Sequence, residues 1–304
     1  MARDLREHEA FCAIAQGAAV IGEWWSLLIV REVTRGRHRF DDLHAELGIS
    51  RRVLAERLKH LLDHDVLERR PYQQRPTRYE YHLTGAGRAL APVLIGLQDW
   101  ADRFVLGDGT LTAEAAPGSA GSERLHALAG TSVPPLFLPS TAGGEQDVVA
   151  GDAPVTVIFT YPATGSPAPP PADRSPIPGA AGCTLENRLF RDTAAAFAEA
   201  GVALRGVSTQ RPDEQRAFAE AEDLPFPLLS DADLTLCAAL RLPTFRAGHY
   251  LRLKRAVIIA GADRMIHHVL HPVTDLPAAV EEALRLGAGL ARERQAGAGT
   301  RIRR

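Results

Sequence analysis

The stretch HRFDDLHAELGISRRVLAERLKHLLDHDVLERRPY, residues 38–72, contains two helical patterns separated by a glycine-containing turn. The first covers residues 40–47, and the second begins after Ser50, a residue type that often caps a helix N-terminus. Two helices joined in this way have helix-turn-helix spacing. The second helix would place five apolar residues on one face: Val53, Leu54, Leu58, Leu61 and Leu62. We therefore predict that this face packs on a core and that the first turn of the helix enters a DNA major groove.

Basic residues gather in the second helix and in the segment after it. Residues 66–84, VLERRPYQQRPTRYEYHLT, alternate like two strands around a tip at residues 73–77, which predicts a wing. Between residues 50 and 78 there are eight basic and four acidic side chains, in a chain of net charge −2. DNA binding must therefore come from this local patch. The predicted DNA contacts are Ser50, Arg51, Arg52, Arg57, Arg75 and Arg78. The alternative is a plain helical hairpin in an enzyme.

Residues 12–43, 48–70 and 78–90 resemble the HxlR family of bacterial winged-helix transcription regulators. The resemblance implies a homodimer, built through the first and last helices of the domain, that binds a palindromic operator in double-stranded DNA. Family members often carry a cysteine at the position of Cys12, and in some it is a redox or electrophile sensor. Cys12 is thus either a redox sensor or a small core residue beside Phe11 and Ile14.

The length of 304 residues exceeds that of one typical domain, so we predict two domains. An apolar content of 45% is enough to build their hydrophobic cores. Residues 107–123, rich in Gly, Ala, Ser and Thr, have the composition of a linker. Strands alternate with helices after residue 153, which indicates an α/β layered sheet. We expect a mainly-α winged helix-turn-helix domain over residues 1–107, a linker over 108–152, an α/β domain over 153–290 and a disordered tail over 291–304.

The three cysteines lie more than fifty residues apart, which excludes a zinc-ligand cluster and a dense disulfide scaffold. We expect no metal and no cofactor. No apolar run approaches the roughly 20 residues of a membrane helix, and the N-terminus lacks the layout of a signal peptide. We therefore expect a cytoplasmic protein without membrane contact.

Cys183 stands in PIPGAAGCTLENRLFRD, residues 176–192, directly before an amphipathic helical pattern. A cysteine reacts as a thiolate, and both a helix N-terminus and a nearby guanidinium stabilise that anion. The sequence thus predicts a reactive thiol at the start of a helix.

Residues 177–245 and 254–269 resemble peroxiredoxins of the AhpC/TSA class, closest to the bacterioferritin-comigratory-protein type. The resemblance implies a thioredoxin-like fold with Cys183 as the peroxidatic cysteine. Pro176 then matches the proline seven residues before it, and Arg255 matches the arginine that steadies thiolate and peroxide. Ala180 stands where the family has a peroxide-binding threonine, and Arg188 stands where many relatives have a resolving cysteine.

Cys237 is the remaining candidate for a resolving thiol in this domain, and its alternative is a core residue between Leu236 and Ala238. Without a resolver, oxidised Cys183 would need an external thiol reductant or Cys12 of a partner chain. The leading prediction is a redox-responsive DNA-binding regulator. The alternatives are a thiol peroxidase with an attached DNA-binding domain, and a regulator whose second domain is catalytically inactive.

Overall fold

The predicted leucine face forms the centre of the first hydrophobic core in the computed structural model, which describes residues 11–106, 117–164, 182–247 and 250–301. Leu54, Leu58 and Leu61 are at most 1% exposed, because each third or fourth residue of the helix returns to the same face. Ile29 and Leu43 from the two preceding helices complete the cluster. The predicted core face of the second helix is confirmed.

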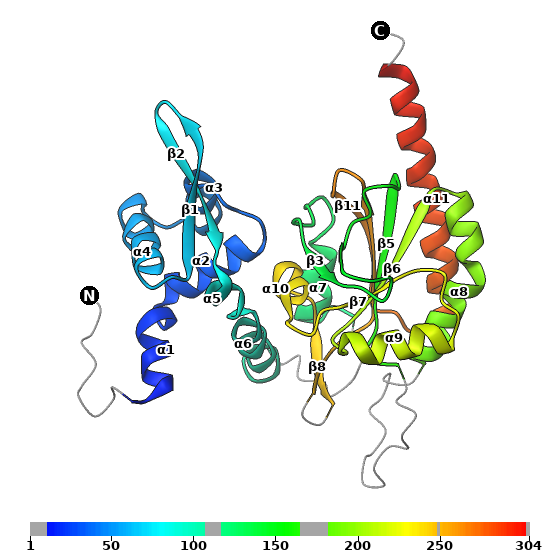
Figure 1. The fold of residues 1–304 in the computed structure, drawn as a ribbon, viewed down its shortest axis with the longest axis horizontal. Coiled ribbons are helices and arrows are strands. Elements are labelled where there is room, and N and C mark those ends of the chain that lie inside the picture. The colour runs from blue at the N-terminus through cyan, green and yellow to red at the C-terminus, as the bar shows by residue number, and fades with distance from the viewer. Residues whose placement is uncertain (1–10, 107–116, 165–181, 248–249, 302–304) are drawn as a thin grey trace. The chain divides into compact units, whose positions relative to one another are not determined.

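The elements around this core follow the predicted winged helix-turn-helix order (Figure 1). Gly48, at φ 62°, ends the third helix in the left-handed conformation that glycine adopts without strain. The Ser50 hydroxyl then accepts the Val53 N–H at 3.3 Å and caps the fourth helix. The two strands pair antiparallel as the wing. The elements are α1 (Ala13–Ile21), α2 (Trp24–Thr34), α3 (Phe40–Leu47), α4 (Arg51–Asp63), β1 (Leu67–Gln74), β2 (Thr77–Leu83), α5 (Gly85–Arg88) and α6 (Ala91–Phe104).

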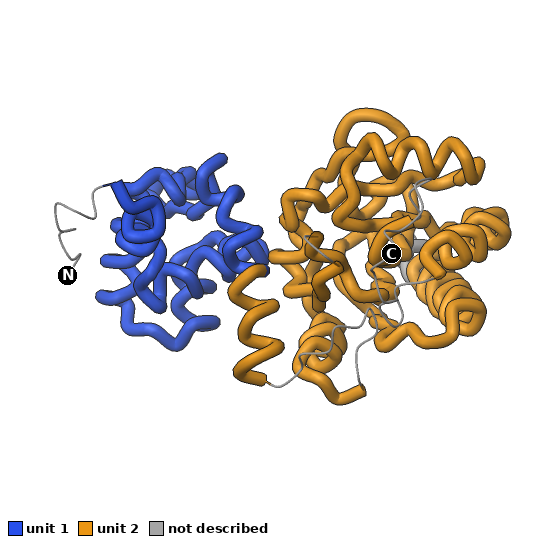
Figure 2. The backbone as a smooth tube through the Cα atoms, turned by 90° about the horizontal axis from the view of Figure 1, so that it is seen from below, with its two compact units in different colours: residues 1–95 blue, residues 96–304 orange. Residues whose placement is uncertain are grey.

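The chain divides into two units, residues 1–95 and 96–304, and each is described here by itself (Figure 2). The division falls inside α6, between Ile95 and Gly96. In unit 1, Leu90 and Leu94 pack against the helix-turn-helix core. The second unit therefore begins earlier in the sequence than residue 153, where we expected it.

Unit 2 is an α/β sandwich around a five-stranded sheet, which confirms the predicted fold class. The strand order is β11-β10-β5-β6-β7, in which β5, β6 and β7 run parallel and β10 is antiparallel to both of its neighbours. Its elements are α7 (Ala120–His126), β3 (Phe137–Pro139), β4 (Glu145–Asp147), β5 (Val155–Thr160), α8 (Cys183–Glu199), β6 (Val202–Ser208), α9 (Pro212–Ala221), β7 (Leu228–Ser230), α10 (Thr235–Leu240), β8 (Thr244–Ala247), β9 (Tyr250–Leu253), β10 (Ala256–Gly261), β11 (Ile266–Leu270) and α11 (Leu276–Arg301).

Strand β5 is buried along its whole length because helices cover both faces of the sheet. Val157 and Phe159 point to the side where α8 contributes Phe190 and Phe197, and α11 packs against α8 there. Figure 1 shows α7 and α10 on the other side of the sheet. Phe159 and Phe190 stack with ring centroids 4.0 Å apart, which ties the first turns of α8 to the sheet centre.

The structure differs from the expected linker and tail. Residues 117–152 contain α7, β3 and β4, and Leu125, Val133 and Val148 there are fully buried. Their apolar side chains are spread among small and polar residues, so composition alone resembled a linker. Helix α11 extends through Arg301, so most of the tail expected to be disordered is helical.

Among the residues that the structure describes, no single helix is long and apolar enough to span a membrane. Helices α1 and α2 reach such a length and hydropathy only as a pair, and they are bent by 75° relative to each other. Within the same residues, no group of three or more His, Cys, Asp and Glu side chains is placed to hold a metal ion.

Candidate functional site

Helix α8 begins at Cys183, as the sequence predicts, and Gly182 is its N-cap. Gly182 has φ 101°, a conformation that side-chain-bearing residues rarely adopt. A Cβ atom there would lie 3.2 Å from Leu276 Cδ1 and 3.8 Å from Arg255 Nη2. Glycine at this position thus lets α8 start close beneath the Arg255 guanidinium.

Arg255 joins two residues of the first turn of α8. Its Nη2 lies 3.1 Å from Cys183 Sγ, and its Nε donates to Glu186 Oε2 at 3.0 Å. All three residues are at most 4% exposed. The structure thus brings together the predicted thiol and the predicted arginine, which lie 72 residues apart in the sequence.

Burial raises the pKa of the Cys183 thiol above its ordinary value. The Arg255 guanidinium and a hydrogen bond from the Ala163 backbone favour the thiolate, whereas the charge of Glu186 opposes it. We expected the helix start and Arg255 to give a thiolate at neutral pH. In this conformation the loss of hydration outweighs the effect of Arg255, so the thiol form is favoured.

Glu186 is a site residue that the sequence reasoning missed. Burial raises the pKa of its carboxyl to about 7, and Arg255 counteracts part of that rise. The available signal was its spacing, since residues three apart on a helix share a face and Glu186 follows Cys183 by three. In this position its carboxylate holds Nε of the guanidinium whose Nη2 contacts the sulfur.

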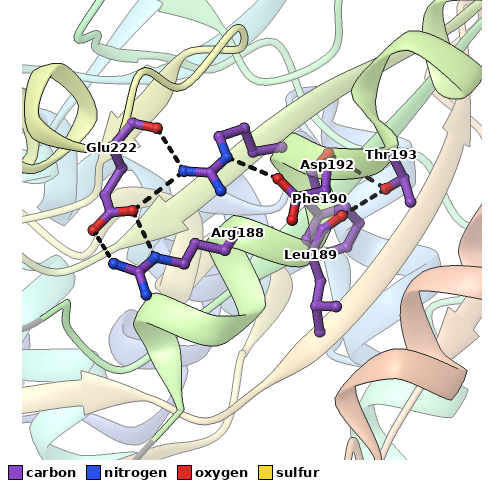
Figure 3. A network of polar contacts seen from close by, with 7 residues as sticks. Arg188, Leu189, Phe190, Asp192, Thr193 and Glu222 are labelled. Atoms are coloured by element: carbon purple, nitrogen blue, oxygen red, sulfur yellow. Dashed lines mark hydrogen bonds and ion pairs between the residues drawn. The ribbon is translucent and has the colours of Figure 1, made fainter.

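Arg188 takes part in a network of ion pairs on the outer side of α8 (Figure 3). Its Nε and Nη2 donate to the two Glu222 carboxylate oxygens at 2.7 and 2.8 Å, and Arg191 donates to the Glu222 carbonyl oxygen at 3.0 Å. The Glu222 side chain is only 14% exposed, so this fork is less screened than an ordinary surface pair. The network joins the second turn of α8 to the end of α9. Arg188 itself stands at the position where the resemblance places a resolving thiol in many relatives.

Cys237 lies in α10 and is completely buried. Its Sγ donates to the Leu242 carbonyl oxygen at 3.6 Å, and burial raises the pKa of its thiol well above the usual value. Its backbone N–H is held by the buried Asp231 carboxylate at 2.8 Å. These contacts match the core alternative for Cys237, and it is absent from the core cluster that contains Cys183. Pro176 and Ala180 lie outside the described residues.

Cys12 is exposed at the N-cap of α1, so its placement as a core residue was wrong for the single chain. Its neighbours Phe11 and Ile14 are 99% and 84% exposed. A role of Cys12 as a sensor stays a prediction.

The predicted DNA contacts differ in how freely they are presented. Arg51 is exposed but pairs with Asp41 at 2.8 Å. Arg57 does not face outward as expected, because its side chain is 13% exposed and pairs with Glu56 and Glu23. On α4 it lies beside Glu23, the N-cap of α2, so its charge stabilises the contact between these two helices.

Three of the predicted arginines, Arg52 on α4, Arg75 at the wing tip and Arg78 on β2, are exposed. Within the described ranges no hydrogen bond or ion pair involves their guanidinium groups, and Gln73 Nε2 donates to the backbone carbonyl oxygen of Arg75 at 3.0 Å. Unpaired guanidinium groups attract phosphates more strongly than paired ones, because a paired charge is already compensated. These three are therefore the best candidates for DNA contacts.

We expect the alkylation rate of Cys183 by iodoacetamide to keep rising with pH beyond the range of an ordinary thiol. Only the thiolate reacts, so a raised pKa means that the thiolate forms at higher pH. Below that pKa, each pH unit gives about tenfold more thiolate and thus a tenfold higher rate. Arg255→Ala removes a cation that favours the thiolate and should slow the reaction at pH 8 about tenfold or more. Peptide-resolved mass spectrometry measures each cysteine separately.

Arg285→Ala is the matched control for that experiment, because Arg285 is exposed on α11 and its partner among the described residues is Glu282. It should leave the Cys183 rate unchanged. A rate that levels off near neutral pH, or an Arg255→Ala rate equal to wild type, would contradict the prediction.

The sequence matches two protein families in separate regions. Residues 20–107 match the HxlR-like helix-turn-helix family, and residues 177–269 match the AhpC/TSA family. The first region covers α2 to α6, and the second contains both Cys183 and Arg255.

Individual relatives follow the same division. An uncharacterized HTH-type transcriptional regulator of Mycobacterium tuberculosis is 39% identical over 93 residues, which are 31% of this chain and 59% of the relative. The chain thus spans little more than half the length of that regulator. A putative peroxiredoxin of the same organism is 32% identical over 157 residues, which are 51% of this chain and 92% of the relative.

Among solved structures, the peroxidoxin BcpB of Mycobacterium tuberculosis is similar, with 28% identity and a TM-score of 0.44 over 54% of this chain and 96% of that one. The matches to families and to relatives both combine an HTH-type regulator with a peroxiredoxin. The chain belongs to the HxlR-like helix-turn-helix family through residues 20–107 and to the AhpC/TSA peroxiredoxin family through residues 177–269.

Proposed function

We propose that this chain is a DNA-binding transcription regulator whose affinity for its operator depends on the oxidation state of Cys183. One observation carries the proposal: Cys183 Sγ lies 3.1 Å from Arg255 Nη2 in a chain that also contains a helix-turn-helix with free arginines. A thiol beside a buried guanidinium is suited to reaction with a peroxide. The DNA-binding unit supplies the output.

The chemistry at Cys183 is a two-electron oxidation by a hydroperoxide. The thiolate sulfur attacks one peroxide oxygen, the O–O bond breaks, and the leaving alkoxide or hydroxide takes up a proton. Sulfur becomes a sulfenic acid and the peroxide becomes an alcohol or water. A thiol reductant then reverses the change in two steps, through a mixed disulfide that a second thiol reduces.

Slow sensing fits the site better than rapid turnover. The raised pKa of Cys183 limits the thiolate fraction, Arg188 occupies the place of a nearby resolver, and Cys237 is sealed in the core. A thiol peroxidase is the second candidate, favoured by the same Cys183–Arg255 pair. Rapid peroxide consumption with dithiothreitol, abolished by Cys183→Ser, would favour it.

For DNA binding, α4 supplies the recognition helix and the β1–β2 hairpin the wing. Arg52 lies in the first turn of α4, where a recognition helix contacts base edges. Arg75 and Arg78 lie at and beside the tip of the wing, where they would contact phosphates. A chain with this role would act in the cytoplasm, where bacterial operators are located.

A second copy of the chain is the proposed partner of α6. Val93, Leu97, Trp100 and Phe104 are each about half exposed or more, and their spacing of four, three and four residues makes one apolar stripe. Helix α1 adds an apolar segment in which no residue is buried. Two copies paired through these helices would present two recognition helices to a palindromic operator.

We propose that α6 also transmits the redox state of Cys183. Within unit 2, Asp99 pairs with Arg246 of β8 at 3.0 Å, and Gln98 donates to the Leu242 carbonyl oxygen at 3.0 Å. Strand β9 pairs with β8 and is tied to the residue after β6, because the Thr209 hydroxyl donates to the Leu251 carbonyl oxygen at 2.7 Å. A change around Cys183 would thus reach a helix whose first turn packs in the DNA-binding unit.

Alanine substitution of Arg52, Arg75 or Arg78 should weaken binding to the promoter region of the chain's own gene. Loss of one phosphate contact lowers the salt slope of log K by about one, and loss of a base contact costs about 1–3 kcal/mol. Fluorescence anisotropy at several salt concentrations measures both. Arg211→Ala, an exposed paired arginine of unit 2, is the control. Unchanged affinity in all three variants would rule out this interface.

Trp100→Glu should convert the dimer to a monomer, because a charge in the middle of the α6 stripe cannot be buried without a partner. Sedimentation velocity measures the mass, and operator affinity should fall with it. Glu123→Gln, an exposed position on α7, serves as control. A wild-type chain that sediments as a monomer, or an unchanged dimer in the variant, would exclude this surface.

Peroxide treatment should change operator affinity of the wild type about tenfold, a coupling of ordinary size for regulated proteins. Cys183→Ser should abolish the response, and Cys12→Ser should preserve it. Asp99→Asn, which breaks the pair with Arg246, should uncouple the two events by leaving Cys183 oxidation intact while reducing the DNA response. If only Cys12→Ser removes the response, the sensor is in the DNA-binding unit instead.

A further inference from the structure

Arg255 lies directly before β10, where the chain enters the central sheet. The next residue, Ala256, pairs with Thr160 of β5. The Thr160 hydroxyl donates to the Lys254 carbonyl oxygen at 2.8 Å, and both residues are at most 4% exposed. On the β5 side, buried hydrogen bonds therefore hold the backbone next to Arg255.

On the other side of β10, strand β11 cannot continue the hydrogen-bond ladder as far as Arg255. The register pairs Val257 with Leu270, the last residue of β11, and two steps further it would bring Pro272 opposite Arg255. Proline has no backbone N–H, so it cannot donate to the Arg255 carbonyl oxygen. A buried carbonyl oxygen without a donor is costly, so a side chain has to replace the missing group.

His271 is the side chain that replaces it. Its Nδ1 lies 2.9 Å from the Arg255 carbonyl oxygen, and the residue is 7% exposed. Because a carbonyl oxygen only accepts, Nδ1 carries the proton in this contact. The His271 carbonyl oxygen accepts in turn from Nε2 of His126 in α7 at 2.9 Å. Contacts of its ring and its backbone thus join the start of β10 to α7.

We propose that His271 is a positioning residue for Cys183: by holding the Arg255 backbone, it keeps the guanidinium in contact with the sulfur. The inference rests on the proposed role of Cys183 as the reactive thiol. From one backbone position, the Arg255 side chain reaches Cys183 Sγ at 3.1 Å and Glu186 Oε2 at 3.0 Å. Both distances are close to the limit for strong contacts, so a displacement of that backbone position by even about 1 Å would weaken both contacts.

The test compares His271→Leu with His271→Asn in the full chain. The two new side chains have similar size, but only asparagine keeps an N–H donor near the place of Nδ1. Below the pKa of Cys183, His271→Leu should slow its alkylation by iodoacetamide about three- to tenfold, because a displaced guanidinium stabilises the thiolate less. The rise of the rate with pH should move to higher pH. His271→Asn should restore the wild-type profile, and peptide-resolved mass spectrometry measures both.

The double variant Arg255→Ala, His271→Leu separates this role from general loosening of the fold. If His271 acts through Arg255, its replacement should change the Cys183 rate by less than about twofold once the guanidinium is absent. Two independent effects would multiply instead. Multiplied effects in the double variant would therefore overturn the inference.

Thr156→Val is the matched control in the same sheet. Thr156 Oγ1 accepts the Ala150 N–H at 3.0 Å, and the residue is fully buried. It pairs with Ala260, near the end of β10 that is remote from Arg255. This variant also loses one buried hydrogen bond, so it should lower the melting temperature while its Cys183 profile matches that of wild type.

NMR of the wild-type chain labelled with ¹⁵N at histidine adds a measurement that does not depend on the stability of His271→Leu. The His271 signal, assigned by comparison with His271→Asn, should show a proton on Nδ1. A neutral ring with its proton on Nε2 alone could not donate to the Arg255 carbonyl oxygen and would overturn the inference.

An unchanged Cys183 profile in His271→Leu would also contradict the inference, and so would an equal shift in Thr156→Val or in His271→Asn. None of these results depends on DNA. If peroxide leaves operator affinity of the wild type unchanged, the proposed regulation fails, whereas the alkylation profiles still decide the role of His271.

Discussion

The buried guanidinium of Arg255 is the interaction on which the site depends. Removing a charge from water costs several kcal/mol, and only close, hydrogen-bonded partners offset it. Cys183 and Glu186 are those partners, and both lie in the first turn of α8. Arg255 directly precedes β10, so the pairing fixes the start of α8 to the sheet. Glu186 supplies the ion pair of this guanidinium, so loss of its carboxylate would be costly.

Burial of this site has two opposite effects on the ionisation of Cys183. It strengthens the attraction between the guanidinium and the sulfur, because fewer water molecules screen them. It also removes hydration from the thiolate, and this loss raises the pKa of Cys183. Hydrogen-bond donors that need no reorganisation therefore matter more here than in an exposed site. The Arg255 guanidinium is such a donor, because Glu186 holds its Nε while its Nη2 contacts the sulfur.

Helix α6 contains residues of both units, because the boundary between them falls between Ile95 and Gly96. Its first residues pack on the helix-turn-helix core, while its later polar residues bond within the second unit. Its remaining face carries an apolar stripe that water does not solvate well. One helix thus contains residues of both units and an apolar stripe that is exposed in the single chain.

Local patterns in the sequence determined much of this protein. The leucine spacing of α4, the Ser50 cap and the alternation of the wing are set by residues a few positions apart, so they could be read directly. The motif around Cys183 likewise predicted a helix start and, through its resemblance, the pairing with Arg255. The tertiary structure alone decided what depends on distant contacts. It turned Arg57 inward to Glu23, folded much of the expected linker, and placed Glu186 beside the guanidinium that contacts the thiol. It also decided the ionisation of Cys183, because the sequence shows which charges are present but not how much water the fold removes from them.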